Sequence, residues 1–380
     1  MNGENLRVLV VDDTVTYRKI VADVLARIPG VEVVAAASNG RLALQKVEIL
    51  RPDVLTLDVE MPEMDGLEVL RRLKTMPEAP GAIMLSAFTA AGAKATVEAL
   101  SLGAFDFVLK PAGESIDDST ATLIRELRPR IEAFAKTRSI RTILAHKTAP
   151  VHAAAAPLVR PAAPERPTAG IAQRMAQIVM GPRGRPHVVA LGISTGGPPA
   201  LTAMMPRLPA DLGVPVLIVQ HMPPIFTKSL ADSLNDKCAL SVCEAQDGQP
   251  VRPNEALIAP GGRQMKVKME DGVAVVRITD DPPENSCRPS VDYLFRSVAH
   301  TYGGNAVGVI MTGMGNDGAL GCRLMKRCGA SIVAQDAASC VVFGMPRMPI
   351  EEGIADVVAP LDRMAGEIAR LVKEGPAACR

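Results

Sequence analysis

The first 138 residues alternate between short apolar runs and longer amphipathic stretches, and this alternation constrains the fold more than any other feature. Five apolar runs have the length of strands, and segments of helical length separate them. The runs span residues 6–12, 31–37, 54–58, 83–87 and 105–110. Five strand-then-helix units predict a parallel sheet with helices on both faces and a site at the carboxyl ends of its strands.

Charged residues stand where these strands are expected to end. They are Asp12 and Asp13 after the first strand, Asp58 at the third and Lys110 at the fifth. Three carboxylates at one sheet edge repel one another unless a cation joins them, and oxygen ligands with room for water suit Mg²⁺. A single aspartate here is usually a helix N-cap, but four charged residues at matching ends favour a functional site.

Length and composition limit the class of protein. A chain of 380 residues predicts two domains, and a net charge of +1 argues against nucleic-acid binding through bulk charge. No stretch has the length of a membrane-spanning helix, and the N-terminus is unlike a signal peptide, so we expect a cytoplasmic protein. The seven cysteines are odd in number and lack CxxC spacing, which predicts neither a zinc site nor a disulfide framework.

The composition changes in the middle of the chain. Residues 148–170 contain eight alanines and five prolines without apolar periodicity, which is typical of a flexible or extended tether, while 171–180 have helical spacing. The connecting segment is also basic. We therefore predict a first domain over residues 1–138, a linker over 139–182 and a second domain over 183–380.

In the second domain, glycines surround Ser194 between the strand-like run 187–191 and the pair Pro198 and Pro199, which suits the first turn of a helix. A serine at a strand-to-helix turn gains free N–H groups and the positive end of a helix dipole, both useful to an oxyanion. The pattern is short, and the same loop could cradle a phosphate. The motif alone leaves a nucleophile and a structural turn as equal alternatives.

A serine nucleophile requires a histidine base. His221 follows the apolar run 215–220, at the same sheet edge as Ser194. An acid must then orient the imidazole, and Asp317 and Asp336 both qualify by position. The glycine-rich turn around Asp317 favours that residue. The remaining histidines flank the linker, open a strand at the opposite edge or lie within an expected helix: His146, His152, His187 and His300.

Two other elements are predicted in this half of the chain. Alternating runs within residues 256–279, around a Glu270-Asp271-Gly272 turn, predict a hairpin that adds antiparallel strands to a mostly parallel sheet. Ser290 suits the N-cap of a helix over residues 291–302.

The first domain resembles the response-regulator receiver family, on the motifs at residues 11–13 (VDD) and 57–62 (LDVEMP), Ser86 and Lys110-Pro111. The resemblance implies a flavodoxin-like five-stranded parallel sheet, phosphorylation of Asp58 and a cis Lys110–Pro111 bond. It also implies roles for further residues. Mg²⁺ would be held by Asp12, Asp13 and Asp58, the phosphoryl group would be contacted by Ser86 and Lys110, and the aromatic switch position is Phe107.

The second domain resembles the catalytic domain of the chemotaxis protein-glutamate methylesterase family, the CheB type. The matching stretches are residues 192–197 (GISTGG), 220–223 (QHMP), 288–292 (RPSVD), 311–318 (MTGMGNDG), 335–340 (QDAASC) and 344–346 (GMP). The resemblance implies a doubly wound, mostly parallel α/β domain that needs no cofactor for ester hydrolysis. It makes Ser194 the nucleophile, His221 the base and Asp317 the orienting acid, with Thr195 and the Met314 backbone shaping the oxyanion site.

The implied function is hydrolysis of glutamyl methyl esters on chemoreceptors, with deamidation of selected glutamines, under control by a histidine kinase of the chemotaxis type. The implied location is the cytoplasm, at receptor arrays. We expect a monomer without nucleic-acid binding or membrane insertion. A related enzyme serving a non-chemotaxis receptor remains the alternative. A DNA-binding output is disfavoured because no helix-turn-helix pattern is present, and a dinucleotide loop because the G-x-G-x-x-G spacing is missing.

Overall fold

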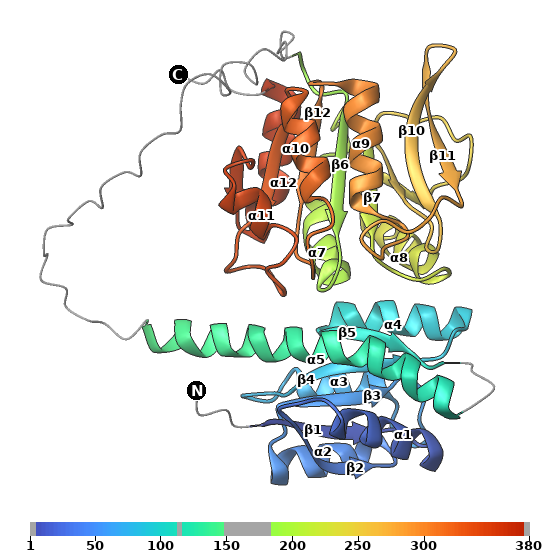
Figure 1. Ribbon diagram of the computed structural model, residues 1–380, viewed down its shortest axis with the longest axis vertical. Helices are drawn as coiled ribbons and strands as arrows, with labels where there is room; N and C mark the ends of the chain where they lie inside the picture. The colour runs from blue at the N-terminus through green and yellow to red at the C-terminus, as the bar shows by residue number, and fades with distance from the viewer. Residues whose placement is uncertain (1–4, 112–115, 148–183, 376–380) are drawn as a thin grey trace, which may run out of the picture.

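The computed structural model describes residues 5–111, 116–147 and 184–375, which form two α/β domains (Figure 1). The helix predicted over residues 171–180 lies outside the described residues. No helix within the described ranges is both long and apolar enough to cross a membrane.

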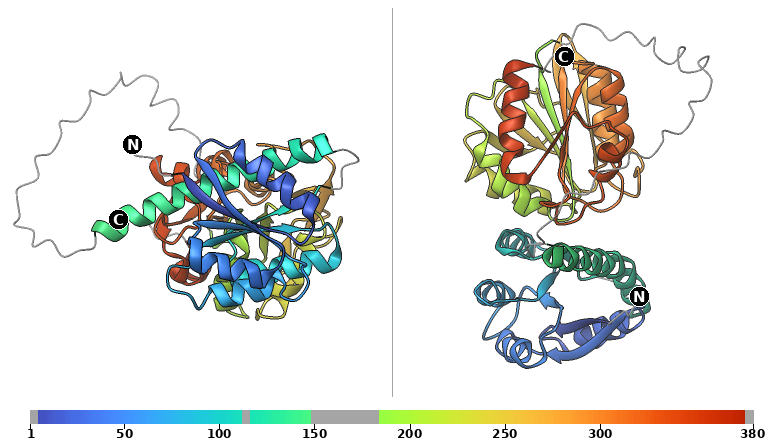
Figure 2. Two further views of the ribbon diagram at one scale, coloured as in Figure 1. Left: turned by 90° about the horizontal axis from the view of Figure 1, so that it is seen from below. Right: turned by 90° about the vertical axis from the view of Figure 1, so that its left-hand side faces the viewer.

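The N-terminal domain is a parallel sheet of order β2-β1-β3-β4-β5, with helices on both faces (Figure 2). This confirms the predicted five-unit fold. Its elements are β1 (Leu6–Val11), α1 (Val15–Ala26), β2 (Val31–Ala37), α2 (Gly40–Leu50), β3 (Val54–Asp58), α3 (Gly66–Leu73), β4 (Gly81–Ser86), α4 (Ala90–Leu102), β5 (Asp106–Leu109) and α5 (Ile116–Lys147).

Local sequence accounts for these boundaries. Strand β3 is buried along its whole length, as expected for a central parallel strand covered on both faces. Asn39, Asp65 and Thr89 cap α2, α3 and α4 by accepting a hydrogen bond from a first-turn N–H. Helix α5 continues to Lys147, beyond residue 139 where the predicted linker begins. The division into two domains and a linker remains a prediction.

The C-terminal domain is a seven-stranded, wholly parallel sheet of order β14-β13-β12-β6-β7-β9-β8. Its elements are β6 (Val188–Ile193), α7 (Gly197–Met204), η1 (Met205–Arg207), β7 (Val216–Gln220), α8 (Phe226–Asn235), β8 (Ser241–Glu244), β9 (Glu255–Ile258), β10 (Gln264–Glu270), β11 (Val273–Thr279), α9 (Val291–Tyr302), β12 (Ala306–Ile310), α10 (Ala319–Arg327), β13 (Ser331–Gln335), α11 (Arg347–Glu351), β14 (Val357–Ala359) and α12 (Leu361–Glu374).

Strand β6 shows why this domain is doubly wound. Its alternate residues enter two different cores, with Val189 and Leu191 packing on one face and Val188 and Ala190 on the other. Figure 2 shows α12 on one face of the sheet and α9 with α10 on the opposite face. A strand covered on both sides must be apolar throughout, which is the pattern that the sequence shows.

The predicted hairpin forms, but its placement in the sheet was wrong. Strands β10 and β11 pair with each other as a separate two-stranded antiparallel sheet, and the run beginning at Ala256 is the parallel strand β9. Strand β9 lies between β7 and β8 and so has no free edge for the hairpin. Met265 and Val276 of the hairpin pack instead in the core formed with α9.

The prediction of a cis Lys110–Pro111 bond was also wrong. Within the described residues, the cis peptide bond is at Arg288–Pro289. Lys110 reaches its carboxylate partners with a trans bond, and Tyr17 Oη donates to the Pro111 carbonyl at 2.6 Å.

The two domains meet where α4, β5 and α5 face the carboxyl end of the C-terminal sheet (Figure 1). Phe107 of β5 stacks on Phe226 of α8, with ring centroids 4.9 Å apart. Thr137 of α5 donates through Oγ1 to the Val341 carbonyl at 3.0 Å. The residues predicted to form the active site therefore lie at the domain interface.

Candidate active site and phosphoacceptor site

Ser194 and His221 directly follow two neighbouring parallel strands. Ile193 at the end of β6 is in register with Gln220 at the end of β7, so the next residue of each strand reaches the same edge. Ser194 N donates to the Thr312 carbonyl at 3.0 Å, and His221 N donates to the Ile193 carbonyl at 3.2 Å. This confirms that the serine and the histidine share one edge, as parallel pairing predicts.

Glycines allow the surrounding loops to approach Ser194. Gly196 has φ +77°, and a Cβ added there would lie 2.4 Å from Val341 Cβ. A Cβ added at Gly313 would lie 2.8 Å from Ser194 Cβ, inside van der Waals contact. The glycine-rich loop thus folds closely over the serine, which is the property that favoured Asp317 over Asp336 in the sequence.

Asp317, and not Asp336, is the acid beside the histidine. His221 Nε2 lies 2.8 Å from Asp317 Oδ2. Asp336 instead accepts hydrogen bonds from Ser339 N and Ser339 Oγ through Oδ1. The contact joins His221 to a residue 96 positions later in the chain. Asp336 has only a local contact, within its own loop, for its side chain among the described residues.

Five donors surround the Asp317 carboxylate, which is only 3% exposed. Burial raises the pKa of Asp317, but these hydrogen bonds and the positive charge on His221 outweigh burial and hold the pKa below its usual value. The donors are His221 Nε2 and Val291 N to Oδ2, and Asn285 Nδ2, Ser290 Oγ and Asp292 N to Oδ1. Three of them belong to the N-terminus of α9, where an anion is favoured.

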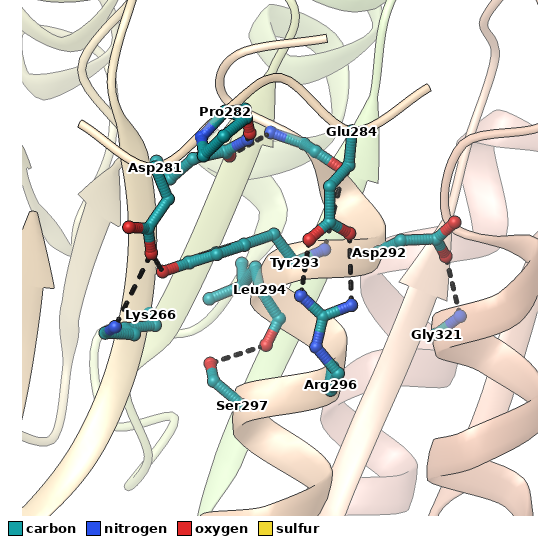
Figure 3. Close-up of polar contacts among 12 residues, drawn as sticks. Lys266, Asp281, Pro282, Glu284, Asp292, Tyr293, Leu294, Arg296, Ser297 and Gly321 are labelled. Atoms are coloured by element: carbon teal, nitrogen blue, oxygen red, sulfur yellow. Dashed lines mark hydrogen bonds and ion pairs between the residues drawn. The ribbon is translucent and has the colours of Figure 1, made fainter. Parts of the chain in front are cut away.

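The start of α9 is itself fixed by polar contacts (Figure 3). Asp292 accepts from Gly321 N at 2.6 Å through Oδ1 and from Asn285 Nδ2 at 2.9 Å through Oδ2. Arg296 forms two hydrogen bonds with the Glu284 carboxylate, at 3.0 and 2.5 Å. The segment that carries Asn285 is therefore anchored to the helix that holds Asp317. Ser290 caps this helix, as predicted, by accepting from Tyr293 N.

The second nitrogen of His221 faces a thiol. Nδ1 lies 3.7 Å from Cys287 Sγ. Burial lowers the pKa of His221, but the hydrogen bonds with Asp317 and Cys287 outweigh it and raise the pKa to about 9. Among the residues that the structure describes, no hydrogen bond joins Ser194 Oγ to this imidazole.

A cavity of about 750 Å³ opens between the domains at this point. Ser194, Thr195, His221 and Met314 line it from the C-terminal domain, and Phe107 and Lys110 are among its residues from the N-terminal domain. The structure thus brings the predicted nucleophile, base and oxyanion-shaping residues to one wall. The opposite wall belongs to the other domain.

The carboxylates of the N-terminal domain form a second site. Oxygen atoms of Asp12, Asp13 and Asp58 lie within 4.8 Å of one another. Lys110 Nζ lies 2.6 Å from Asp58 Oδ2 and 2.8 Å from Asp12 Oδ2. Hard oxygen ligands at this spacing, with Asp13 exposed to solvent, fit a hydrated Mg²⁺.

Burial is the largest influence on Asp58 and raises its pKa to about 6, assisted by the charge on Asp12 and opposed by Lys110. A divalent cation would relieve this concentration of negative charge. Ser86 is buried nearby, and its Oγ accepts from Thr96 Oγ1 at 2.8 Å. Phe107 is buried against the other domain.

Sequence reasoning missed three residues of the active site. Asp106 of β5 accepts a 2.8 Å hydrogen bond from Thr195 Oγ1 across the domain interface. Asn285 bridges Asp292 and Asp317, and Cys287 faces His221. Asn285 and Cys287 shortly precede the recognisable motif at residues 288–292, so their closeness to it in the sequence could have identified them. Nothing local in the sequence connects Asp106 with Thr195.

Comparison with known proteins assigns the family. The model of the CheB methylesterase family matches residues 189–368, and that of the response regulator receiver domain matches residues 8–118. A protein-glutamate methylesterase/protein-glutamine glutaminase of Desulfotalea psychrophila is 48% identical, over 97% of this chain and 99% of its own. The chain belongs to the CheB family. This confirms the resemblance, and with it the prediction of an enzyme.

Other CheB proteins are similar to this chain. The relative of the same name from Trichodesmium erythraeum is 40% identical, over 96% of this chain and 99% of its own. The crystal structure of the Thermotoga maritima CheB methylesterase catalytic domain is 40% identical, covers 50% of this chain and 100% of that one, and gives a TM-score of 0.49.

Proposed function

We propose that this CheB-family chain hydrolyses glutamyl methyl esters on chemoreceptors and deamidates selected glutamines. The observation that carries the proposal is the His221–Asp317 pair, at 2.8 Å, beside the strand end that bears Ser194. A buried, fully hydrogen-bonded carboxylate next to an imidazole is the arrangement that acyl-transfer enzymes require of a base. The choice of methylated glutamates and glutamines as substrates rests on the name of the relatives, protein-glutamate methylesterase/protein-glutamine glutaminase.

Asp317 determines which histidine nitrogen acts as the base. The carboxylate is ionised and accepts the proton on Nε2, so the lone pair of neutral His221 lies on Nδ1. Nδ1 takes the Ser194 proton as Oγ attacks the ester carbonyl. His221 then returns this proton to the leaving methanol, and water hydrolyses the glutamyl-enzyme through the same base.

Backbone N–H groups around Thr195 and Met314 stabilise the tetrahedral oxyanion, at about 3 kcal/mol for each donor. Glutamine deamidation uses the same acyl-enzyme, but ammonia is a poorer leaving group than methanol. Protonation by His221 therefore matters more for the amide than for the ester.

Methanol release from methylated receptor membranes tests this mechanism. Ser194→Ala removes the attacking oxygen, and we expect release to fall by about 10³-fold or more. Ser286→Ala is the matched control, because Ser286 lines the same cavity without a place in the mechanism, and it should retain most of the wild-type rate. Undiminished release by Ser194→Ala would rule out the mechanism.

We infer that phosphorylation of Asp58, by a histidine kinase of the chemotaxis type, activates the esterase. Asp12, Asp13 and Asp58 would hold Mg²⁺, which offsets charge on the phosphoryl group. Lys110 would pair with a phosphoryl oxygen, and Ser86 would contact another.

The interface supports this control, because the receiver forms one wall of the active-site cavity. Phe107 stacks on Phe226, and Asp106 holds Thr195, the residue after the nucleophile. Movement of β5 on phosphorylation would break these contacts and open the cavity. Regulation of this kind is a shift between packed and open populations.

The full chain with Mg²⁺ and a small phosphodonor such as acetyl phosphate tests the control. Methanol release should rise on addition of the donor, and Asp58→Asn should remove the rise while keeping the unstimulated rate. Equal rates with and without the donor would contradict activation.

We place the protein in the cytoplasm, at receptor arrays, because its proposed substrates lie there. We retain the prediction of a monomer.

A further inference from the structure

A thiol, an imidazole and a carboxylate form a chain of successive contacts in the active site. Cys287 Sγ is 3.7 Å from His221 Nδ1, and His221 Nε2 is 2.8 Å from Asp317. Of the cysteines in the described ranges, Cys287 is the one with a histidine nitrogen at hydrogen-bond distance. The nitrogen that the proposed mechanism assigns to Ser194 therefore also faces a sulfur.

We propose that Cys287 is a site of reversible oxidation by peroxides and that its oxidation inhibits the enzyme. The first half of the proposal concerns thiol chemistry alone. The second half rests on the proposed esterase function, because it requires His221 to be the base.

His221 is placed to take the proton of the Cys287 thiol. The thiolate, and not the thiol, attacks electrophiles, and a neighbouring imidazolium stabilises it. Asp317 holds the proton on Nε2, so Nδ1 is free to accept the proton of the thiol. The products are a thiolate and an imidazolium in contact, with Asp317 balancing the positive charge.

The position of Cys287 is both fixed and accessible. Cys287 N donates to the Glu284 carbonyl at 2.8 Å, and Glu284 N donates to the Cys287 carbonyl at 3.1 Å. Arg296 holds the Glu284 side chain (Figure 3). Cys287 is half-buried and lines the cavity that contains Ser194, so a molecule as small as hydrogen peroxide reaches the sulfur.

The reaction balances with peroxide as the oxidant. The Cys287 thiolate attacks one peroxide oxygen, so an S–O bond forms while the O–O bond breaks. The second oxygen leaves as hydroxide and takes the imidazolium proton to become water. Sulfur loses two electrons and peroxide gains them. The resulting sulfenic acid lies against Nδ1 and occupies the base, and a thiol reductant restores Cys287.

The same three residues have ligand atoms close enough for a metal ion. However, the oxygens of Asp317 already accept five hydrogen bonds, and a metal bond would displace donors from the start of α9. These hydrogen bonds therefore favour proton transfer from Cys287 Sγ to His221 Nδ1 over the binding of a metal ion by the three residues.

Sulfenic-acid labelling of the full chain tests the thiol chemistry without reference to activity. After brief treatment with hydrogen peroxide, dimedone labelling is read at each cysteine by mass spectrometry. We expect Cys287 to label at least about tenfold faster than Cys243 and Cys328, which are also half-buried. His221→Gln should slow labelling of Cys287 alone. Equal labelling of the three cysteines, or no effect of His221→Gln, would overturn the proposal.

Methanol release tests the inhibition. Peroxide should abolish release by the wild type, and dithiothreitol should restore it. Release by Cys287→Ala should be the same before and after peroxide, whatever its untreated rate, whereas the control Cys243→Ala should be inhibited like the wild type. Equal inhibition of Cys287→Ala would overturn this half of the proposal. If the untreated wild type released no methanol, the esterase function would fail while the labelling result would still decide the thiol chemistry.

Discussion

Asp58 and Asp317 are carboxylates with nearly equal burial, but their pKa values shift in opposite directions. Their exposed fractions are 4% and 3%, and each has a basic side chain within 2.8 Å. The pKa of Asp58 is raised to about 6, whereas that of Asp317 is lowered. The difference lies in their donors, because five hydrogen bonds support charge on Asp317 while Asp58 shares Lys110 with Asp12. Donors to the charged form, and not burial alone, determine which carboxylate stays ionised.

The two environments suit two kinds of chemistry. Asp317 is held rigidly and in one charge state, as an orienting acid must be. Asp58 lies in a site with more negative charge than its single lysine balances, so a divalent cation and a covalent modification can both change it. Similar sheet edges thus hold a carboxylate that stays ionised in one domain and, under the proposed function, a switch in the other.

The largest predicted effect is that of Asp317→Asn. The amide keeps the size of the side chain but removes the charge that fixes the proton on His221 Nε2, so kcat for methanol release should fall by about 10³- to 10⁴-fold. Asp336→Asn is the control, because the side chain of Asp336 accepts from Ser339 and does not contact His221 in the described residues, so the substitution should be nearly silent. Similar losses in the two variants would contradict the assignment of the acid.

Asp58→Asn should stabilise the protein at neutral pH. The raised pKa means that the folded state binds more protons than the unfolded state between about pH 4 and 6, so stability falls as pH rises through this window. Removing the charge should add about 1–2 kcal/mol at pH 7.5 and nothing at pH 4. Urea unfolding at both pH values measures the difference. Equal effects at pH 4 and 7.5, or destabilisation at pH 7.5, would show that burial does not set this pKa.

Asn285→Ala should have a smaller effect on activity. It removes one of the five donors to Asp317 and the bridge to Asp292, so we expect kcat to fall by about tenfold. Ser286→Ala changes the neighbouring residue without removing a donor to Asp317. Comparable rates for the two variants would mean that the remaining four donors are sufficient.

Much of this arrangement could be predicted from the sequence because it depends on local patterns. Apolar runs identified the strands, and their parallel pairing brought Ser194 and His221 to one edge. The glycines near Asp317 favoured it over Asp336, and the structure places Asp317 beside His221 with the close loop approach that these glycines permit. These inferences require only the geometry of parallel sheets.

The rest depends on contacts between distant segments. Asn285 and Cys287 reach the site through a turn whose position is fixed by α9, and Asp106 reaches Thr195 from another domain. The hairpin was misplaced because local alternation does not reveal that β8 already pairs with β9. Side-chain contacts of this kind have no signature in the spacing of one sequence.

The comparison of the two carboxylates is tested most directly by their titration. In the full chain with ¹³C-labelled aspartate side chains, the carboxyl resonances of Asp58 and Asp317 can be assigned with Asp58→Asn and Asp317→Asn and followed from pH 3 to 8. We predict that Asp58 titrates near pH 6 and that Asp317 titrates below the usual aspartate value. An Asp317 that titrates at or above the pKa of Asp58 would contradict the claim that hydrogen-bond donors decide the charge.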